Sequence, residues 1–162
     1  MEMLVLLLQR IVALLRGRRR TEPRPATPAG RASVFLRHLD CGSCNGCELE
    51  LSALTNPLYD MERFGISFVA SPRHADVLVM TGPFTRNLAE AAELTFEAMS
   101  TPRRIVAIGD CADDGGIFKE SYAVAPRPDK IERAIVARVR GCPPAPDEIL
   151  EVLVNLSMPP AR

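Results

Sequence analysis

Short apolar runs alternate with amphipathic segments from residue 33 to residue 158. Parallel strands covered on both faces read as nearly continuous apolar stretches, and amphipathic helices repeat their apolar residues every three or four positions. These patterns predict strands at residues 33–39, 66–71, 76–82, 103–111 and 133–142. They predict helices at residues 47–54, 85–100 and 144–156, the second with one side formed by Leu88, Ala91, Ala92, Thr95 and Met99.

The alternation of strands with helices predicts the fold class. Strands separated by helices form a parallel sheet through right-handed crossovers. We therefore expect one α/β domain over residues 33–158, with helices on the faces of a parallel sheet. Ligands of such open sheets bind beyond the carboxyl ends of the strands, so the loops at that edge are the first place to look for a site.

The amino-terminal segment has a different pattern. Residues 1–17 predict an amphipathic docking helix, with Leu4, Leu8, Ile11 and Leu15 at helical spacing. Its apolar part would span about 20 Å, which is too short for a hydrocarbon core of about 30 Å. We expect the helix to lie on a membrane surface or in a groove of a partner, and packing on its own domain is an equal alternative. Residues 18–32 predict a Pro/Arg-rich linker.

Composition and charge fit a globular protein of one domain. Hydrophobic residues make up 47% of the 162 residues, and the formal net charge is zero. The charge is uneven, because residues 1–32 carry seven arginines against Glu2 and Glu22. This basic arm suggests docking to anionic lipid or to an acidic protein surface, although a solvated arm without a partner has the same composition. We expect no nucleic-acid partner.

The chain has five cysteines, an odd number that cannot pair completely in disulfides. No convincing cleavable signal precedes the domain, which favours a reducing compartment, where neighbouring thiols more often hold metal than form disulfides. Cys44 and Cys47 come after the predicted strand at 33–39, and Cys111 and Cys142 stand at the carboxyl ends of the predicted strands at 103–111 and 133–142. The fold and the cysteine positions therefore point to the same edge of the sheet, and iron–sulfur clusters commonly need four thiolates from such converging loops.

Other interpretations of these cysteines stay open. Zinc also binds four thiolates, but structural zinc sites usually come as two C-x-x-C pairs. Residues 41–47 form a ferredoxin-like C-x-x-C-x-x-C run, but position 51, where the next cysteine would stand, is Leu. Buried or redox-active thiols are a further alternative. Cys41 is most simply a spare thiol near the site, and it could also replace Cys44 as a ligand.

Five motifs together resemble a known family. They are "CNGCELE", "NPLYDMERFGI", "SPRHADVLVMTGPFTRN", "GDCADDGGIF" and "GCPPAPDEIL", and they run in order from about residue 34 to residue 156. They resemble the small iron–sulfur subunit of membrane-bound energy-converting [NiFe] hydrogenases of the formate hydrogenlyase and hydrogenase-4 types. The chain is likewise similar to the homologous 20-kDa subunit of NADH:quinone oxidoreductase, respiratory complex I.

The resemblance implies a flavodoxin-like α/β domain with one [4Fe–4S] cluster held by Cys44, Cys47, Cys111 and Cys142. It implies an electron-transfer subunit of an oxidoreductase complex that is not a complete catalyst alone. The expected partners are a large catalytic subunit, a ferredoxin-like iron–sulfur subunit and membrane subunits. The expected place is peripheral, on the cytoplasmic face of the cell membrane.

The spacing of the first two ligands separates the branches of this family. Complex I members typically carry adjacent cysteines there, whereas this chain has Cys44 and Cys47 with two residues between them. The spacing favours the hydrogenase-like function. A complex I type subunit that passes electrons to quinone, and a structural metal-binding module without a redox role, remain the alternatives.

Acidic residues flank the expected ligands. Glu48 could relay protons near the cluster, or it could be a solvated acid in the first turn of a helix. Asp110, Asp113 and Asp114 surround Cys111, and their negative charge would lower the reduction potential of a nearby cluster unless solvent screens it.

Overall fold

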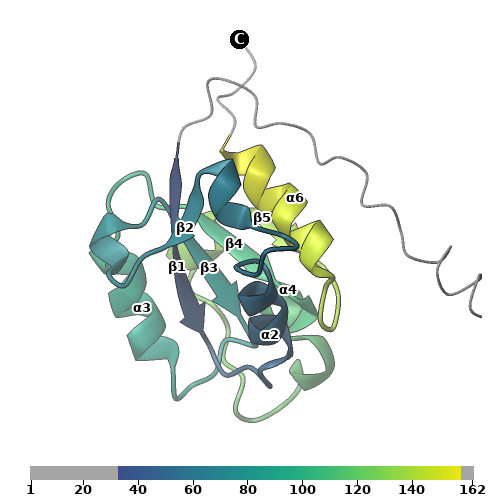
Figure 1. The fold of residues 1–162 in the computed structure, drawn as a ribbon. Helices are drawn as coiled ribbons and strands as arrows, with labels where there is room; N and C mark the ends of the chain where they lie inside the picture. The colour runs from purple at the N-terminus through teal and green to yellow at the C-terminus, as the bar shows by residue number, and fades with distance from the viewer. Residues whose placement is uncertain (1–32, 158–162) are drawn as a thin grey trace, which may run out of the picture.

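The computed structural model describes residues 33–157, and the expected helix at 1–17, the linker at 18–32 and residue 158 lie outside this range. Five parallel strands form one sheet in the order β2-β1-β3-β4-β5 (Figure 1). The strands are β1 (Val34–Asp40), β2 (Ile66–Phe68), β3 (Val77–Thr81), β4 (Ile105–Ile108) and β5 (Ile135–Val139). This strand order is that of flavodoxin-like sheets, so the predicted fold class is confirmed.

Helices follow the strands along the chain. The longer ones are α2 (Gly46–Ala53), α3 (Ala89–Ala98) and α6 (Pro146–Leu156), and the short ones are α4 (Asp110–Asp114) and α5 (Asp129–Glu132). Three single-turn 3-10 helices lie at Met61–Phe64, Pro72–His74 and Gly116–Phe118. Among residues 33–157, no helix combines the length and the apolar character needed to cross a bilayer.

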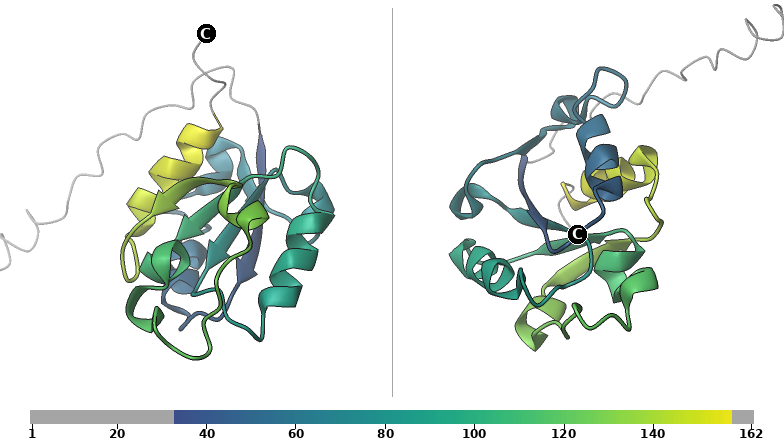
Figure 2. Two further views of the ribbon diagram at one scale, coloured as in Figure 1. Left: turned by 180° about the vertical axis from the view of Figure 1, so that it is seen from behind. Right: turned by 90° about the horizontal axis from the view of Figure 1, so that it is seen from below.

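The helices cover both faces of the sheet, as the two views of Figure 2 show. On one face, α2 and α6 pack on the strands through Leu51, Ile149 and Leu153. On the other face, α3, α4 and α5 pack through residues that include Phe96, Ala112 and Ile131. Every residue of β3 and β4 is buried, which explains why these two strands read as unbroken apolar runs.

The observed elements differ from the expected ones mainly at their ends. The second strand stops at Phe68 rather than residue 71, because β2 is an edge strand that pairs with β1 over only three residues. The predicted strand at 103–111 ends at Ile108, and Cys111 lies in the short helix α4 that follows. On α3, Phe96 is buried and Ala91 is exposed, so the apolar side is displaced from the predicted one.

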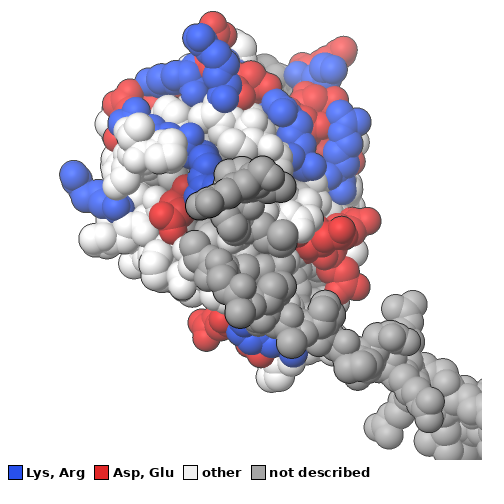
Figure 3. Space-filling view, turned by 90° about the horizontal axis from the view of Figure 1, so that it is seen from above, with Lys and Arg blue, Asp and Glu red and all other residues white. Residues whose placement is uncertain are grey.

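The opposite edge of the sheet, at the amino ends of the strands, carries a mixture of charges. Figure 3 views this edge, and Lys and Arg side chains lie beside Asp and Glu side chains around its visible described part. The cysteines lie at the other edge, so the two ends of the sheet differ in chemistry.

Leu36 in β1 gives a direct test of this core. Its side chain is fully buried between strands and helices, so Leu36→Ala is expected to cost about 2–5 kcal/mol of unfolding free energy through lost burial and a residual cavity. The exposed Leu94 on α3 is the matched control, and Leu94→Ala should change stability by less than about 0.5 kcal/mol. Urea unfolding of the full chain measures both. Equal losses in the two variants would contradict the packing described here.

Candidate iron–sulfur site

The four predicted ligands come together at the carboxyl edge of the sheet. Cys44 and Cys47 follow β1, Cys111 follows β4, and Cys142 lies in the loop between β5 and α6. Since α2 and α4 lie on opposite faces of the sheet, the cysteines approach the edge from both faces. We call Cys44, Cys47, Cys111 and Cys142 the four-cysteine site.

Contacts at glycines show how closely the segments approach. A Cβ atom added at Gly109 would lie 2.5 Å from the Cys47 sulfur and 3.5 Å from the carbonyl oxygen of Gly141. A Cβ atom at Gly46 would lie 3.6 Å from the Cys44 sulfur and 3.8 Å from Pro143 Cδ. The loop after β1 therefore touches both the segment that leads to Cys111 and the segment that contains Cys142.

The electrostatics of the thiols agree with this proximity. Burial raises the pKa of Cys47 to about 12, and Glu48 and the other three cysteines of the site contribute to the rise. Burial also raises the pKa of Cys111, and Cys142 and Cys44 add to this effect. Thiolates this close repel one another unless a cation binds them, so the chain alone favours protonated thiols and metal binding would favour thiolates.

Cys41 lies elsewhere. Its side chain is fully buried in the core on the α3 face, with Met80 and Phe84. Burial raises the pKa of Cys41 to about 12, Asp40 raises it and Arg127 opposes the rise, and no other cysteine contributes. The structure thus brings four of the five cysteines together and leaves Cys41 in the core, which supports its interpretation as a spare thiol.

The turn between β1 and the first ligand is fixed by its own residues. Asp40 accepts hydrogen bonds from the backbone N–H groups of Gly42 and Ser43, at 2.8 and 2.7 Å. Burial raises the pKa of Asp40, but these hydrogen bonds outweigh that effect and hold it below its ordinary value. The Thr85 hydroxyl donates to the carbonyl oxygen of Cys41 at 2.7 Å. These bonds set the direction in which the chain leaves β1 toward Cys44.

Glu48, next to Cys47, is not a solvated acid, so that alternative is wrong. Its side chain is 16% exposed, its Oε1 accepts a hydrogen bond from the Thr81 hydroxyl, and it lies 3.6 Å from Nε2 of His38. Burial lowers the pKa of His38, and Glu48 only partly opposes this. Nothing in the sequence marks His38 and Thr81 as partners of Glu48, because they meet Glu48 only when β1, β3 and α2 assemble.

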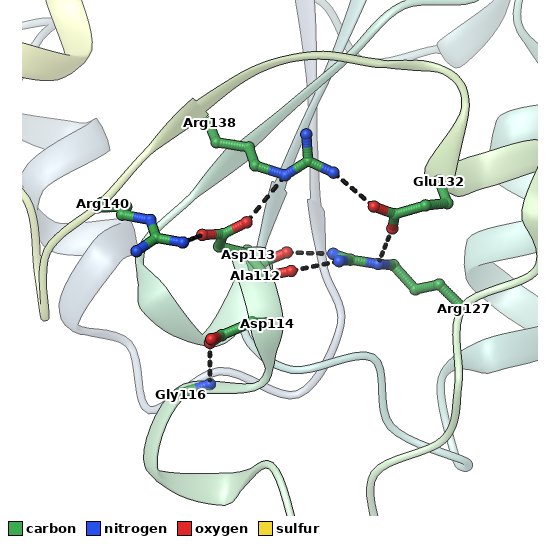
Figure 4. Close-up of polar contacts among 8 residues, drawn as sticks. All are labelled: Ala112, Asp113, Asp114, Gly116, Arg127, Glu132, Arg138 and Arg140. Atoms are coloured by element: carbon green, nitrogen blue, oxygen red, sulfur yellow. Dashed lines mark hydrogen bonds and ion pairs between the residues drawn. The ribbon is translucent and has the colours of Figure 1, made fainter.

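The acidic residues around Cys111 also have ion-pair or hydrogen-bond partners in the structure. Asp113 is buried and forms ion pairs with Arg138 and Arg140, as Figure 4 shows. Asp110 accepts a hydrogen bond from Gly141 N, and Asp114 accepts one from Gly116 N. The lowering of the reduction potential expected from these carboxylates stays a prediction, and for Asp113 the effect is weakened because two arginines balance its charge.

The donor set fits an iron–sulfur cluster in chemistry and number. Clusters are held by four thiolates, and the site offers four from three segments of the chain that contact one another. Within residues 33–157, no group of three or more His, Cys, Asp or Glu side chains is placed to hold a metal ion. Gly109 keeps the space beside the Cys47 sulfur open, because any side chain at that position would fill it.

Comparisons with known proteins place the chain in a family. The sequence profile described as NADH ubiquinone oxidoreductase, 20 Kd subunit, matches residues 44–156. The probable membrane-bound hydrogenase subunit mbhJ of Pyrococcus furiosus is 43% identical over 122 residues, covering 75% of this chain and 72% of that protein. Formate hydrogenlyase subunit 7 of Escherichia coli is 43% identical over 116 residues, covering 72% of this chain and only 45% of that longer protein.

A further relative is a complex I subunit, and chains of solved oxidoreductase structures also superpose on this chain. An NADH-quinone oxidoreductase subunit of Heliobacterium modesticaldum is 40% identical over 68% of this chain and 63% of that protein. A chain of the archaeal membrane-bound sulfane sulfur reductase, a respiratory membrane complex, superposes with a TM-score of 0.63 at 26% identity, covering 78% of this chain and 71% of that chain. A chain of an NAD+-reducing [NiFe]-hydrogenase superposes with a TM-score of 0.54 at 16% identity, covering 81% and 96%, a likeness of fold alone.

The relatives are subunits of hydrogenase, complex I and related oxidoreductase assemblies, two of them membrane-bound. The family profile spans more than half of the chain, and it includes all four cysteines of the site. This chain therefore belongs to the NADH ubiquinone oxidoreductase 20 Kd subunit family, together with subunits of membrane-bound hydrogenases.

Proposed function

We propose that this chain holds one [4Fe–4S] cluster through Cys44, Cys47, Cys111 and Cys142. In this role it relays electrons to or from the active site of a partner large subunit in a membrane-bound, hydrogenase-like complex. When bound, the cluster supplies one-electron exchange. The observation that supports the proposal is the close approach of three segments that are distant in sequence: Gly109 lies beside the Cys47 sulfur and the Gly141 carbonyl oxygen, and Gly46 lies beside Pro143, the residue after Cys142.

The residues of the chain have distinct tasks in this proposal. The four thiols hold the cluster, and the glycines leave room beside the sulfurs. The cores on both faces of the sheet fix the strand ends from which the loops start. The exposure of Cys44 and Cys142 puts one side of the site at the protein surface, where a partner can approach. The bond chemistry would take place in that partner.

A second candidate function is electron transfer to quinone in a complex I type assembly. It is favoured by the 40% identity to the NADH-quinone oxidoreductase subunit of Heliobacterium modesticaldum. The two-residue gap between Cys44 and Cys47 favours the hydrogenase-like alternative. In both cases we propose a peripheral subunit on the cytoplasmic face of the membrane, with a ferredoxin-like subunit and membrane subunits as further partners.

The partner decides between the two candidates. A tagged copy of the chain, purified from membranes of its own organism, should bring down a large subunit that can be identified and sequenced. Two C-x-x-C pairs in that large subunit, together with bound nickel, support the hydrogenase-like function. A large subunit without them and without nickel contradicts it and supports the quinone-reducing alternative.

The loop after Cys111 offers a contact surface for this large subunit. Ile117 is 83% exposed and lines a cavity together with Cys111 and Cys142, and Tyr122, further along the chain, is 91% exposed. Exposed apolar patches beside a site are typical of contact surfaces. The double substitution Ile117→Ser with Tyr122→Ser is expected to weaken association with the large subunit at least about tenfold, because aromatic residues dominate interface energies. Co-purification at matched expression measures this. Leu94→Ser on α3 is the control, and equal recovery in all variants would contradict the contact.

A further inference from the structure

The short helix that carries Cys111 is held by a network of ion pairs, drawn in Figure 4. Helix α4 has only five residues, too few to be stable without tertiary support. The Arg127 guanidinium donates hydrogen bonds to the carbonyl oxygens of Ala112 and Asp113, near the end of α4. Since the last carbonyl groups of a helix have no partner within it, Arg127 caps the carboxyl end of α4.

Asp113 connects this helix to the segment that leads to Cys142. Its side chain is 8% exposed, and its two oxygens lie 2.8 Å from Arg138 Nε and 2.7 Å from Arg140 Nη2. Arg138 is in β5 and Arg140 stands two residues before Cys142, while Asp113 stands two residues after Cys111. One buried carboxylate thus joins the two ligand-bearing segments.

The network closes on itself. Glu132 of α5 pairs with Arg138 and also with Arg127, whose Nε lies 2.9 Å from a Glu132 oxygen. The ring therefore runs from Asp113 through Arg138, Glu132 and Arg127 back to the carbonyl oxygens of α4. Three arginines face two carboxylates within the network, and Asp110 and Asp114 also line the cavity that Cys111 and Cys142 line.

The network also borders the site itself. Asp113 and Arg140 line the same cavity of about 340 Å³ as Cys111 and Cys142. Backbone hydrogen bonds already pair the two segments near the sheet, from Gly109 N to the Val139 oxygen and from Asp110 N to the Gly141 oxygen. The ion pairs of Asp113 attach the far end of α4 as well. Asp113 therefore fixes the direction in which the helix runs, rather than deciding whether the helix forms.

We propose that Asp113 is a positioning residue for the iron–sulfur site: through Arg138 and Arg140 it fixes Cys111 relative to Cys142 and sets the charge that the cluster meets. This inference rests on the proposed function, because it needs the cluster. Partners that orient metal ligands typically change metal affinity about 10- to 100-fold when they are replaced. A buried carboxylate that pairs with two arginines has a strong effect when it is removed, because Arg140 loses this ion pair and Arg138 keeps only its pair with Glu132.

The test uses the full chain with its cluster assembled, and it compares three variants with the unaltered chain. Asp113→Asn keeps the size of the side chain and removes its charge. Arg140→Gln removes the opposite end of the same ion pair at a side chain that is 75% exposed, so folding should tolerate it. Asp129→Ala is the matched control, because Asp129 is an exposed aspartate paired with Arg133 on α5, outside the network.

Two quantities are measured, the rate of iron loss to a chelator and the midpoint reduction potential of the cluster. Asp113→Asn should lose iron about 10- to 100-fold faster and show a higher potential, because loss of a negative charge favours the reduced, more negative cluster. Arg140→Gln should show a lower potential, since a positive charge is lost. Asp129→Ala should change neither quantity. A role limited to fold stability would not produce potential shifts of opposite sign.

The outcomes separate this inference from the proposed function. If the unaltered chain binds its cluster and Asp113→Asn matches it in iron loss and potential, the inference about Asp113 is overturned while the cluster remains. If Asp113→Asn does not fold, an unchanged potential in Arg140→Gln overturns it equally. If the unaltered chain takes up no iron and sulfide, the proposed function fails, and the inference fails with it.

Discussion

Replacement of Cys111 by alanine is expected to abolish assembly of the cluster, whereas replacement of Cys41 by alanine should leave it intact. Cys111 lies near the other three cysteines of the site. Cys142 and Cys44 raise the pKa of Cys111, and Cys111 raises the pKa of Cys47. A cubane that loses one of four thiolate ligands lacks the coordination that holds it. Cys41 is buried in the core and makes no comparable approach.

The two cysteine variants form a matched pair, because both remove one thiol and only one removes a proposed ligand. Iron and acid-labile sulfide per chain, together with the visible absorbance of the cluster, measure the outcome. We expect iron to fall to near zero in Cys111→Ala and to stay at about four per chain in Cys41→Ala. Cys41→Ala should cost about 1 kcal/mol of stability through lost burial. Retention of the full cluster in Cys111→Ala would rule out the proposed ligand set.

Gly109→Ala is expected to have nearly as large an effect on the cluster, without removing any ligand. The added Cβ would lie 2.5 Å from the Cys47 sulfur, closer than such atoms can approach, so the sulfur must move. Gly109 also has a φ of +89° with ψ of 154°, a conformation that only glycine adopts readily. The variant should therefore lose most of its cluster and also lose stability.

Gly65→Ala separates the clash from the backbone strain. Gly65 also has a positive φ, +76°, but an added Cβ would lie 3.6 Å from its nearest neighbour, Ser33 Cα, an ordinary contact. This variant should lose about 1–2 kcal/mol of stability from the left-handed backbone and keep its iron. Iron content after anaerobic assembly and urea unfolding measure both effects. Equal iron content in the two glycine variants would show that Gly109 does not shape the site.

The sequence alone predicted the central part of the fold, because burial on both faces leaves a clear pattern. β3 and β4 are apolar at nearly every position, so their existence and parallel pairing could be inferred. The loops that contain the four cysteines followed from the same strands. The short elements were less predictable. Strand β2 has only three residues, and α4 and α5 have too few residues to show a helical period.

The surroundings of the site could not be predicted, because they depend on contacts between distant segments. Nothing in the sequence pairs Asp113 with Arg138, and only solvent was expected to screen its charge. Glu48 likewise looked like a first-turn acid, and its contact with Thr81 appears only when the sheet forms. Cys41 was expected to be the spare thiol, but the regular spacing of the three cysteines gave no sign that its side chain turns into the core.

The most direct test of the central claim is Mössbauer spectroscopy of the full chain, purified anaerobically from cells grown on iron-57, together with iron and sulfide analysis. The account predicts one [4Fe–4S] spectrum, with about four iron and four sulfide per chain, that disappears in Cys111→Ala and persists in Cys41→Ala. Zinc in place of iron, or an iron spectrum that survives the loss of Cys111, would contradict it.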